Sequence, residues 1–289
     1  MISIKLSTPY IQYDIGLDNL TVLAGTKGKS IFLKLFYSMS YVARHGSIPA
    51  ELAEYISTLN NHEKVTYSLL NNDELIHELI IENNEGQPGW HQALYDEPYD
   101  VILFPTETDA YIKYGIPTLK YAYMKKLKAL IDALNKQGKN KIELPKVLPR
   151  FSIEGKSIYQ QLNENKKIKI TESSASWIKI AFLTTIIENG LISKDIYMLF
   201  DKYEAGMHPI YQTMFAYLIG KLVINGYRII ITTNDLTFMS ILKSIDKVPS
   251  TMGLEETFNL TPRLYVIDHT KTTEYSIQSS SIPTYNVGD

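Results

Sequence analysis

Apolar residues in the first hundred positions occur in short runs, most of them alternating with polar residues or closed by turn formers. Such runs predict β-strands, whereas apolar residues at helical spacing predict a helix. The strands expected here are Ile2–Leu6, Ile11–Ile15, a strand that begins near Leu20 and enters a glycine turn, Lys64–Leu70, Glu78–Glu82 and Val101–Phe104, with one largely buried helix from Ile31 to about Ala43. The turn at residues 71–73 separates two of these strands, which favours an antiparallel N-terminal β lobe.

Helix and strand patterns alternate in the second half of the chain. A helix is expected over about Ile116–Asn135, followed by a lysine-rich tail as far as Arg150. The other elements expected here are a helix over Ala175–Asn189, a strand over Ile196–Asp201, a helix over Pro209–Asn225, a strand over Arg228–Thr232 and a hairpin of Leu264–Ile267 with Thr273–Gln278. Strands alternating with helices favour a parallel sheet with helical crossovers, so the expected fold class is α/β.

Composition fits an ordinary globular protein and excludes several other classes. Of the 289 residues, 45% are hydrophobic and 21% are charged, and the formal net charge of −2 gives no overall attraction to nucleic acid or membrane. The lack of cysteine excludes disulfides and thiolate metal sites. No apolar run approaches the ~18 residues of a membrane span, and the alternating N-terminus lacks the pattern of a signal peptide. We therefore expect a cytoplasmic protein that crosses no membrane.

The sequence LTVLAGTKGKS at residues 20–30 is typical of a buried strand, a glycine turn and a helix start. A P-loop uses small residues so that backbone N–H groups converge on phosphate oxygens at a helix N-terminus. The usual spacing puts glycine where Leu23 stands, so Gly25 would take over the turn; the alternative is a chance match at a lysine-rich surface turn. The nucleotide-binding residues expected from this motif are Gly25, Thr26, Lys27, Gly28, Lys29, Ser30 and Ile31.

A second motif ends the apolar strand IYMLFD at residues 196–201. An aspartate at the carboxyl edge of a buried parallel strand lies beside the P-loop in nucleotide-binding folds, where it binds magnesium directly or through water. Asp201 and the Ser30 hydroxyl are therefore expected metal ligands. Taken alone, Asp201 is also compatible with a carboxylate that simply begins a loop.

The segment that follows carries a resemblance to a known family. DKYEAGMHP at residues 201–209 resembles the Asp-Glu-Pro-Glu-Ala-Gly-Leu-His-Pro segment of ABC-type P-loop ATPases of the SMC, RecF and OLD-nuclease group. Residues 101–108 are similar to the strand with Pro-Ser/Ala-Glu-Arg of compact members. Residues 171–176 stand where the signature motif opens a long helix, and residues 230–235 match a strand ending in Thr-Thr-His-Ser. The order of these matches extends the resemblance over most of the chain.

The resemblance implies a single ABC-type ATPase-like domain over residues 1–289, with a mostly parallel sheet, an antiparallel N-terminal β subdomain and a helical lid. Its parts would be an N-terminal β lobe with the P-loop (1–105), a helical, lysine-rich insertion (106–170) and a lobe with the signature, Walker B and switch segments (171–289). ATP and Mg²⁺ are the implied cofactors. Two such heads sandwich two nucleotides, so the implied partner is a second copy or a related ATPase subunit.

The signature segment would supply phosphate contacts across that dimer. In the family the signature serines of one head contact the γ-phosphate held by the other, and the matching residues are Ser173 and Ser174. A serine-rich helix N-terminus suits an anion, because its N–H groups and hydroxyls all donate hydrogen bonds. The alternative role for these serines is helix N-capping alone.

Three departures from the family pattern concern catalysis. The glutamate that orients the attacking water falls at Lys202, the switch histidine falls at Asn234, and the arginine of the Pro-x-Glu-Arg segment falls at Thr108. A charged lysine cannot accept a proton, and an asparagine cannot carry charge. Glu107 is retained as either a magnesium-shell carboxylate or a structural one, and Glu204 lies beyond the catalytic position as a substitute base.

These departures lead to a hypothesis of ATP binding with slow hydrolysis or none, in DNA maintenance or defence. One alternative is a nonenzymatic regulatory or scaffold subunit that has lost nucleotide. Another is a genuine ATPase that uses Glu204 or Glu107, with Asn234 assisting.

The Lys120–Arg150 segment has a local excess of positive charge. Its nine basic residues face only two acidic ones, Asp132 and Glu143. Such a segment can contact DNA or RNA phosphates, with Tyr121 and Tyr123 as stacking candidates; a solvated lid on the head is the alternative. The basic residues are Lys120, Lys125, Lys126, Lys128, Lys136, Lys139, Lys141, Lys146 and Arg150.

Overall fold

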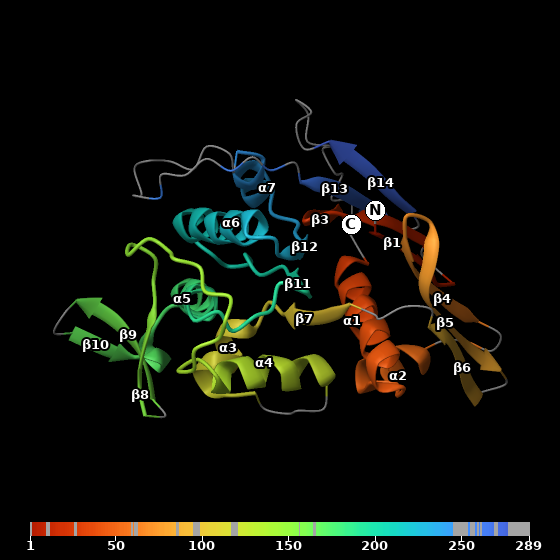
Figure 1. Ribbon diagram of the computed structural model, residues 1–289, viewed down its shortest axis with the longest axis horizontal. Helices are drawn as coiled ribbons and strands as arrows, with labels where there is room; N and C mark the ends of the chain where they lie inside the picture. The colour runs from red at the N-terminus through yellow and green to blue at the C-terminus, as the bar shows by residue number, and fades with distance from the viewer. Residues whose placement is uncertain are drawn as a thin grey trace.

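The computed structural model describes most of the chain. The described residues are 2–9, 12–25, 28–58, 60, 63–84, 87–94, 99–116, 121–155, 157–163, 166–244, 254, 258, 260, 262–268 and 271–276. Their strands form three sheets, and helices cover both faces of the largest one (Figure 1).

The largest sheet has six strands in the order β14-β13-β3-β12-β11-β7. They are β3 (Leu20–Gly25), β7 (Asp100–Phe104), β11 (Ile196–Asp201), β12 (Arg228–Thr232), β13 (Arg263–Asp268) and β14 (Lys271–Ser276). Neighbours are parallel except for the β13–β14 hairpin. The expected mostly parallel sheet is confirmed, and its continuous apolar strands reflect burial on both faces. The parallel strands bring the carboxyl ends of β3, β11 and β12 to one edge of the sheet.

The second sheet is antiparallel and comes from the N-terminal part, in the order β2-β1-β4-β5-β6. Its strands are β1 (Ile2–Ser7), β2 (Gln12–Leu17), β4 (Lys64–Asn71), β5 (Glu74–Asn84) and β6 (Gln87–Leu94). Helix α1 (Lys29–His45) lies between this sheet and the main sheet, with α2 (Ala50–Ile56) beside it (Figure 1). Every second residue of β4 is buried, and these side chains pack with the apolar face of α1 in one hydrophobic core between the two sheets.

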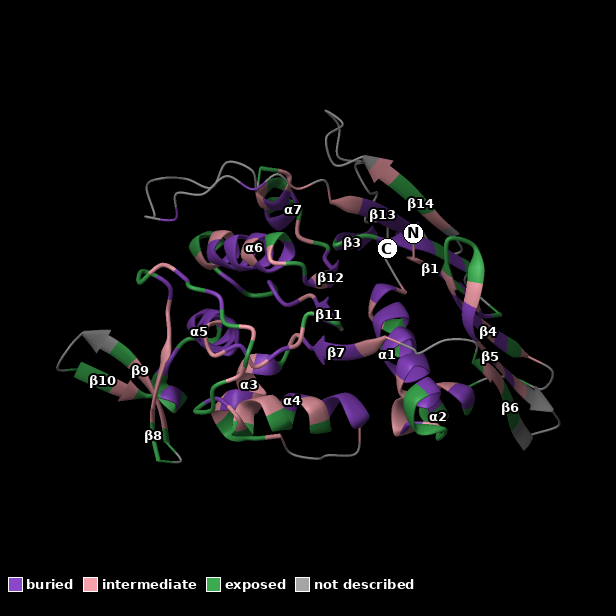
Figure 2. Cartoon of the chain, in the orientation of Figure 1, coloured by how far each residue is buried: buried purple, intermediate pink, exposed green. Residues whose placement is uncertain are grey.

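Helices α5 (Ala175–Glu188) and α6 (Pro209–Ile224) cover the opposite face of the main sheet, and α7 (Leu236–Lys243) packs on α6. Both α5 and α6 are apolar around most of their circumference; Figure 2 shows α5 almost entirely buried and α6 buried along its middle, with exposed residues at its ends. A helix of this kind belongs in a protein interior. None of the helices in the described ranges is long and apolar enough to span a membrane.

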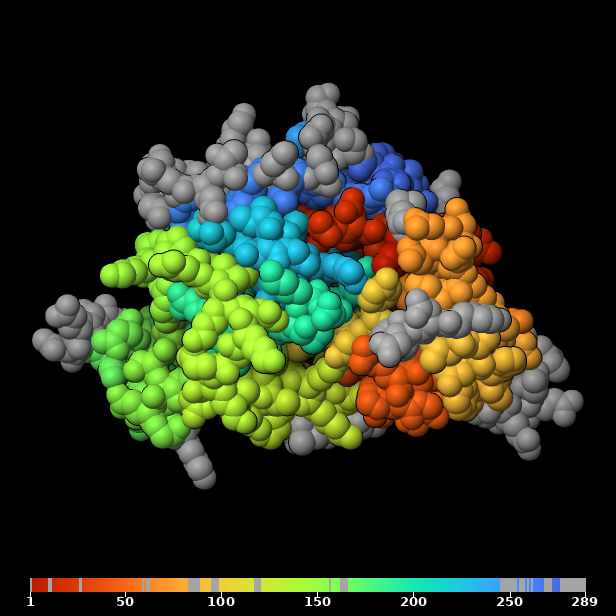
Figure 3. Space-filling view, in the orientation of Figure 1, coloured from red at the N-terminus to blue at the C-terminus, as the bar shows by residue number. Residues whose placement is uncertain are grey.

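Residues 106–170 contain two helices and a third sheet. The helices are α3 (Thr108–Tyr114) and α4 (Ala122–Asp132), so the helix expected over Ile116–Asn135 is shorter than predicted, and its residues 117–120 lie outside the described ranges. The antiparallel sheet, which the sequence pattern did not predict, has the order β10-β9-β8. Its strands are β8 (Phe151–Glu154), β9 (Ser157–Asn163) and β10 (Lys166–Lys169). It lies at the opposite end of the molecule from the strands β4–β6 (Figure 3).

Most of the predicted elements are confirmed within one to four residues at their ends. Five features were missed: α2, α3, α7, β6 and the β8–β10 sheet. Ile11, at the start of one predicted strand, and residues 277 and 278, at the end of another, lie outside the described ranges.

Candidate nucleotide-binding site

The P-loop motif lies where β3 ends and α1 begins. Gly28 has φ +92° and immediately precedes α1, and its carbonyl accepts a hydrogen bond from the Tyr13 hydroxyl at 2.9 Å. Gly25 has φ +116°, and a Cβ there would come within 2.0 Å of the Ile267 carbonyl oxygen in β13. Only glycine fits this backbone and this close approach, so Gly25 does take the turn position that Leu23 cannot. Thr26 and Lys27 lie outside the described residues.

Lys29 is the first residue of α1 and is 2% exposed. Its ammonium donates a hydrogen bond to the carbonyl oxygen of Gly25, four residues earlier. Burial and the nearby charge of Lys202 lower the pKa of Lys29 to about 8, against the opposing effect of Asp201 and Glu204. Lys29 is therefore a partly desolvated cation whose ammonium is hydrogen-bonded to a carbonyl oxygen of its own loop.

Ser30 and Asp201 join the two motifs. The Ser30 hydroxyl donates to Asp201 Oδ1 at 2.7 Å, across 171 residues of sequence. The Thr232 hydroxyl, from the end of β12, donates to the same oxygen at 2.8 Å. A hydroxyl beside a carboxylate is the donor set that Mg²⁺ prefers, so these residues fit the implied ion. The sequence predicted Ser30 and Asp201 and missed Thr232; the available signal was that Thr232, like Asp201, ends a predicted parallel strand, and the two residues are paired in the β11–β12 register.

Lys202, which the sequence resemblance aligns with a catalytic glutamate, has a backbone φ of +46°. Its N–H donates to both the hydroxyl and the carbonyl oxygen of Thr232, at 3.0 and 3.1 Å. This backbone is therefore fixed to the end of β12, and its side chain is partly exposed beside the P-loop lysine. The residue adds a cation where a water-orienting carboxylate is expected.

Glu204 is a buried carboxyl with 2% exposure. Its Oε1 accepts a hydrogen bond from the Thr233 hydroxyl at 2.5 Å, and no described residue hydrogen-bonds Oε2. Burial is the main cause that raises its pKa to about 7; Asp235 raises it further, whereas Thr233 and Lys179 oppose the rise. The carboxyl is therefore bound to the residue that follows β12, lies within the electrostatic influence of Lys179 in α5, and is shielded from solvent.

The signature serines differ in their surroundings. Ser174 is exposed and caps α5, because its hydroxyl accepts a hydrogen bond from Trp177 N at 3.3 Å. Ser173 is 4% exposed, and its hydroxyl has no hydrogen-bond partner among the described residues, while its carbonyl accepts from Lys113 Nζ at 3.1 Å. The capping role is thus real for Ser174, and an unpaired hydroxyl remains at Ser173.

Asn234 and Glu107 are both exposed. Asn234 follows β12, and the next residue, Asp235, caps α7 by accepting from the N–H groups of Thr237 and Phe238. Glu107 immediately precedes α3, next to Thr106, whose hydroxyl donates to the Asp201 carbonyl at 2.8 Å. The described residues hold no group of three or more His, Asp or Glu side chains that could hold a metal ion.

Lys179 is a buried residue of this region that the sequence pattern did not single out. From the middle of α5, its ammonium donates to the carbonyl oxygens of Tyr203 and Ala205, at 3.0 and 3.3 Å. It also lies 3.8 Å from Asp109 Oδ1 of α3. A charged residue inside an otherwise apolar helix was the available signal, because such a residue is buried only with partners.

This fold is similar to solved SMC head structures. The crystal structure of "the SmcHead bound to the C-winged helix domain of ScpA" aligns with a TM-score of 0.54 and 13% identity, over 96% of this chain and 97% of that chain. The Smc head with an extended coiled coil bound to the C-terminal domain of ScpA, derived from Pyrococcus furiosus, aligns with a TM-score of 0.52, 13% identity and the same coverage. No family model and no curated protein matches the sequence. The chain has the fold of an SMC/ABC-type ATPase head.

Proposed function

We propose that this chain is an ATP-binding head that hydrolyses ATP slowly or not at all. The observation that carries the proposal is the 2.7 Å hydrogen bond between Ser30 and Asp201, which unites two motifs 171 residues apart. Lys29 stands beside this pair as a desolvated cation. These residues would hold the phosphates and Mg²⁺, and the metal would supply neutralisation of phosphate charge.

The proposal that hydrolysis is slow depends on the lysine at position 202. A cation there offers no acceptor for the proton of an attacking water, and Asn234 cannot supply charge in the transition state. Loss of a group that orients water costs on the order of a hundredfold or more in rate. Glu204 as a substitute base has little support, because it is buried and already bonded to Thr233. Glu107 is exposed, and the described residues hold no group of three or more carboxylate or histidine side chains around it that could hold a metal ion.

Nucleotide would act through assembly in this proposal. The exposed Ser174 and the unpaired hydroxyl of Ser173 support phosphate contacts from α5 to a nucleotide on a second head, either another copy or a related ATPase subunit. The two similar head structures are bound to ScpA domains, which also makes a protein partner worth testing. A role in DNA maintenance or defence and a cytoplasmic location stay predictions.

Nucleic-acid binding by residues 120–150 has lost part of its support. Tyr123 is buried against Tyr37, so its ring is not open for stacking on bases, and one face of the Tyr121 ring is already stacked on Tyr123. Arg150 is bound to Glu188 and to nearby carbonyl oxygens. We therefore interpret residues 120–150 as a solvated lid on the head.

Calorimetry with ATP and Mg²⁺, together with mass measurement by light scattering, tests the binding proposal. We expect ATP binding, and Lys29→Ala should weaken it by about ten- to a hundredfold, because a charge-assisted contact is lost. Lys34→Ala is the matched control, because Lys34 is an exposed lysine on the same helix. Binding that raises the mass supports assembly of two heads on nucleotide. No binding by the unmodified chain leaves the scaffold alternative, which the contact of Lys29 with its own loop favours.

Steady-state ATPase measurements test the slow-hydrolysis part. We expect little turnover in the unmodified chain and an increase in Lys202→Glu. Robust turnover of the unmodified chain that Lys29→Ala abolishes would contradict this part of the proposal.

A further inference from the structure

Strand β6 forms one edge of the N-terminal sheet. The sheet order is β2-β1-β4-β5-β6, so β5 is the one described strand that pairs with β6. The opposite edge, β2, contacts the P-loop, because the Tyr13 hydroxyl donates to the Gly28 carbonyl. Four strand spacings of about 4.8 Å separate the two edges, which places them about 19 Å apart. The β6 edge is therefore distant from the candidate nucleotide-binding site (Figure 1).

Two large apolar side chains of β6 are open to solvent. Trp90 is 41% exposed and Leu94 is 46% exposed. Their neighbours across the β5–β6 pair, Ile81 and His77, are buried. Because directly opposite residues and residues two apart on a strand share one face, all four side chains lie on the inner face of the sheet. The apolar inner face thus continues onto β6, where it becomes exposed.

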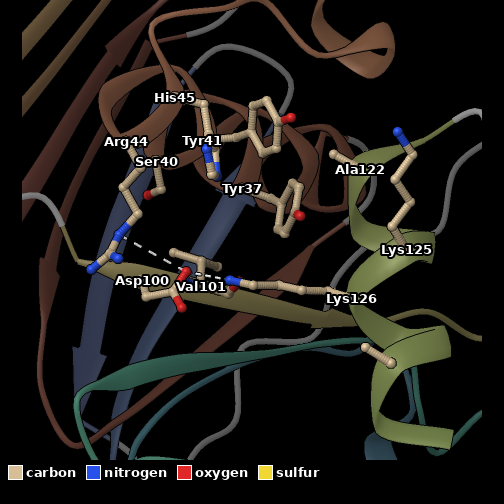
Figure 4. Close-up of a pocket in the computed structure, with 11 residues that line it drawn as sticks. Tyr37, Ser40, Tyr41, Arg44, His45, Asp100, Val101, Ala122, Lys125 and Lys126 are labelled. Carbon is tan, nitrogen blue, oxygen red and sulfur yellow. Dashed lines mark hydrogen bonds and ion pairs between the residues drawn. The ribbon is translucent and has the colours of Figure 1, made fainter. Parts of the chain in front are cut away.

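The helices that cover this inner face are bound to other parts of the chain. Arg44 of α1 lies 4.0 Å from Asp100 of β7, which also contacts the Lys126 ammonium of α4, beside the pocket between these elements (Figure 4). Helix α2 is bound to α4, because Glu51 Oε1 accepts a hydrogen bond from Tyr123 N at 3.2 Å. These contacts hold both helices on the side of β7 and α4, away from β6 (Figure 1).

Strand β6 also lacks the charges that keep sheet edges apart. Charged residues on an edge strand oppose its pairing with another chain. The other five edge strands of the described sheets each carry such a residue: Asp14 in β2, Asp100 in β7, Glu154 in β8, Lys167 in β10 and Glu274 in β14. In contrast, the β6 sequence QPGWHQAL contains no Lys, Arg, Asp or Glu. Two copies of β6 can therefore lie side by side without a like-charge contact.

An antiparallel pair of β6 strands is self-complementary. With a two-fold axis at Gln92, Trp90 of each copy lies opposite Leu94 of the other, on the same face. Gln92 then faces Gln92 of the second copy. Its side chain lies beside His77, yet its Oε1 is buried and makes no hydrogen bond with a described residue. An amide N–H of the second Gln92 would supply a donor to this oxygen.

We propose that two copies of this chain associate through their β6 edges, as an antiparallel pair of residues 90–94 about a two-fold axis at Gln92. The pairing would join the two five-stranded sheets into one and pack each Trp90 against the Leu94 of the other copy. Pro88, which has no N–H for a ladder, lies outside the paired residues. An interface of five residues on each side is small, so the dimer is weak, and it needs no nucleotide.

Sedimentation velocity of the unmodified chain without nucleotide, at concentrations up to about 200 µM, tests the proposal. We expect the mass to rise from one chain to two, with Lys29→Ala behaving in the same way. Gln92→Lys and Gln92→Glu each place like charges opposite each other, so each should associate at least about tenfold more weakly. Their equimolar mixture should associate again, because lysine then faces glutamate. Thr273→Lys, at an exposed residue of the β14 edge, is the matched control and should associate like the unmodified chain.

Three results would overturn the proposal. They are the mass of a single chain at every concentration, unweakened association of both Gln92 variants, and no association in their mixture when each variant shows a melting transition of a folded head. Association that requires ATP would assign the contact to the nucleotide-binding face instead. Failure of the chain to bind ATP would contradict the proposed function but not this inference, because the experiment contains no nucleotide.

Discussion

At the scale of single residues, Glu204 lies in surroundings that favour its protonated form. It is nearly inaccessible to solvent, and only one of its oxygens has a hydrogen-bond donor among the described residues. The ammonium of Lys179 acts on it from α5 but does not outweigh burial, so the pKa remains raised. The unfolded chain holds this carboxyl near its ordinary pKa of 4.5, and the folded chain near 7.

The sign of this shift predicts a loss of stability as pH rises. Below about pH 4.5 the group is protonated in both states, and between 4.5 and 7 only the folded chain keeps the proton. Above pH 7 the folded chain holds a buried carboxylate, at a cost of about 3 kcal/mol. Glu204→Gln should therefore melt within about 2 °C of the unmodified chain at pH 5 and roughly 5–10 °C above it at pH 8.5, measured without nucleotide or metal.

Glu143→Gln serves as the control for that experiment, because Glu143 is exposed. Its melting temperature should follow that of the unmodified chain at both pH values. A constant offset between Glu204→Gln and the unmodified chain at pH 5 and 8.5 would contradict the raised pKa.

At the scale of elements, Lys179 joins α5 to the segment that follows β11. Its ammonium bonds two carbonyl oxygens of that segment and lies near Asp109 of α3. In return, the Tyr203 hydroxyl donates to the Lys179 carbonyl at 3.0 Å. The helix that opens with the signature serines is thus fixed to the loop that begins at Asp201 and Lys202.

Replacing Lys179 with Met should loosen this connection. Two buried carbonyl oxygens and Asp109 would lose their partner, which we expect to cost about 2–4 kcal/mol of unfolding free energy in urea. Amide exchange should accelerate at Ala205 and Met207, whose N–H groups bond Lys202 and Glu204 within the same loop. Lys194→Met, at an exposed lysine, is the control. Unchanged exchange in the loop would mean that Lys179 does not hold it.

The individual strands and helices differ in how well the sequence predicted them. Strands β3, β11 and β12 were predicted closely, because a central parallel strand requires a continuous apolar run. The β8–β10 sheet was missed because its strands are short, partly exposed and rich in lysine and glutamine, so they carry little alternation. Helices α2, α3 and α7 have eight residues or fewer, too few for a clear period.

The sequence predicted those parts of the candidate nucleotide-binding site whose positions follow from the order of the parallel strands. Ser30 and Asp201 were brought together by one rule, that the carboxyl ends of parallel strands share an edge. The burial of Glu204 could not be predicted, because it depends on α5 and β12 packing over a loop whose own sequence is typical of a solvent-exposed turn.

At the scale of the whole molecule, one sheet supplies both hydrophobic cores. Successive side chains of its parallel strands point to opposite faces, so Leu23 and Leu199 enter the core with α1, whereas Val22 and Phe200 enter the core with α5 and α6. Removing either core would expose one face of the same strands. The two faces therefore depend on each other for burial.

This shared sheet predicts that the chain unfolds in a single cooperative transition. Scanning calorimetry should give a calorimetric enthalpy close to the van't Hoff enthalpy. With ATP and Mg²⁺ at about a hundred times the dissociation constant, binding adds about 2.7 kcal/mol, which should raise the midpoint of that one transition by roughly 5–10 °C. Lys29→Ala should melt as a single transition that the same ATP concentration raises by less than in the unmodified chain, because its weaker affinity lowers the stability that binding adds. Two resolved transitions, or an ATP effect on only one of them, would show that residues 1–105 unfold separately from the lobe that carries Asp201.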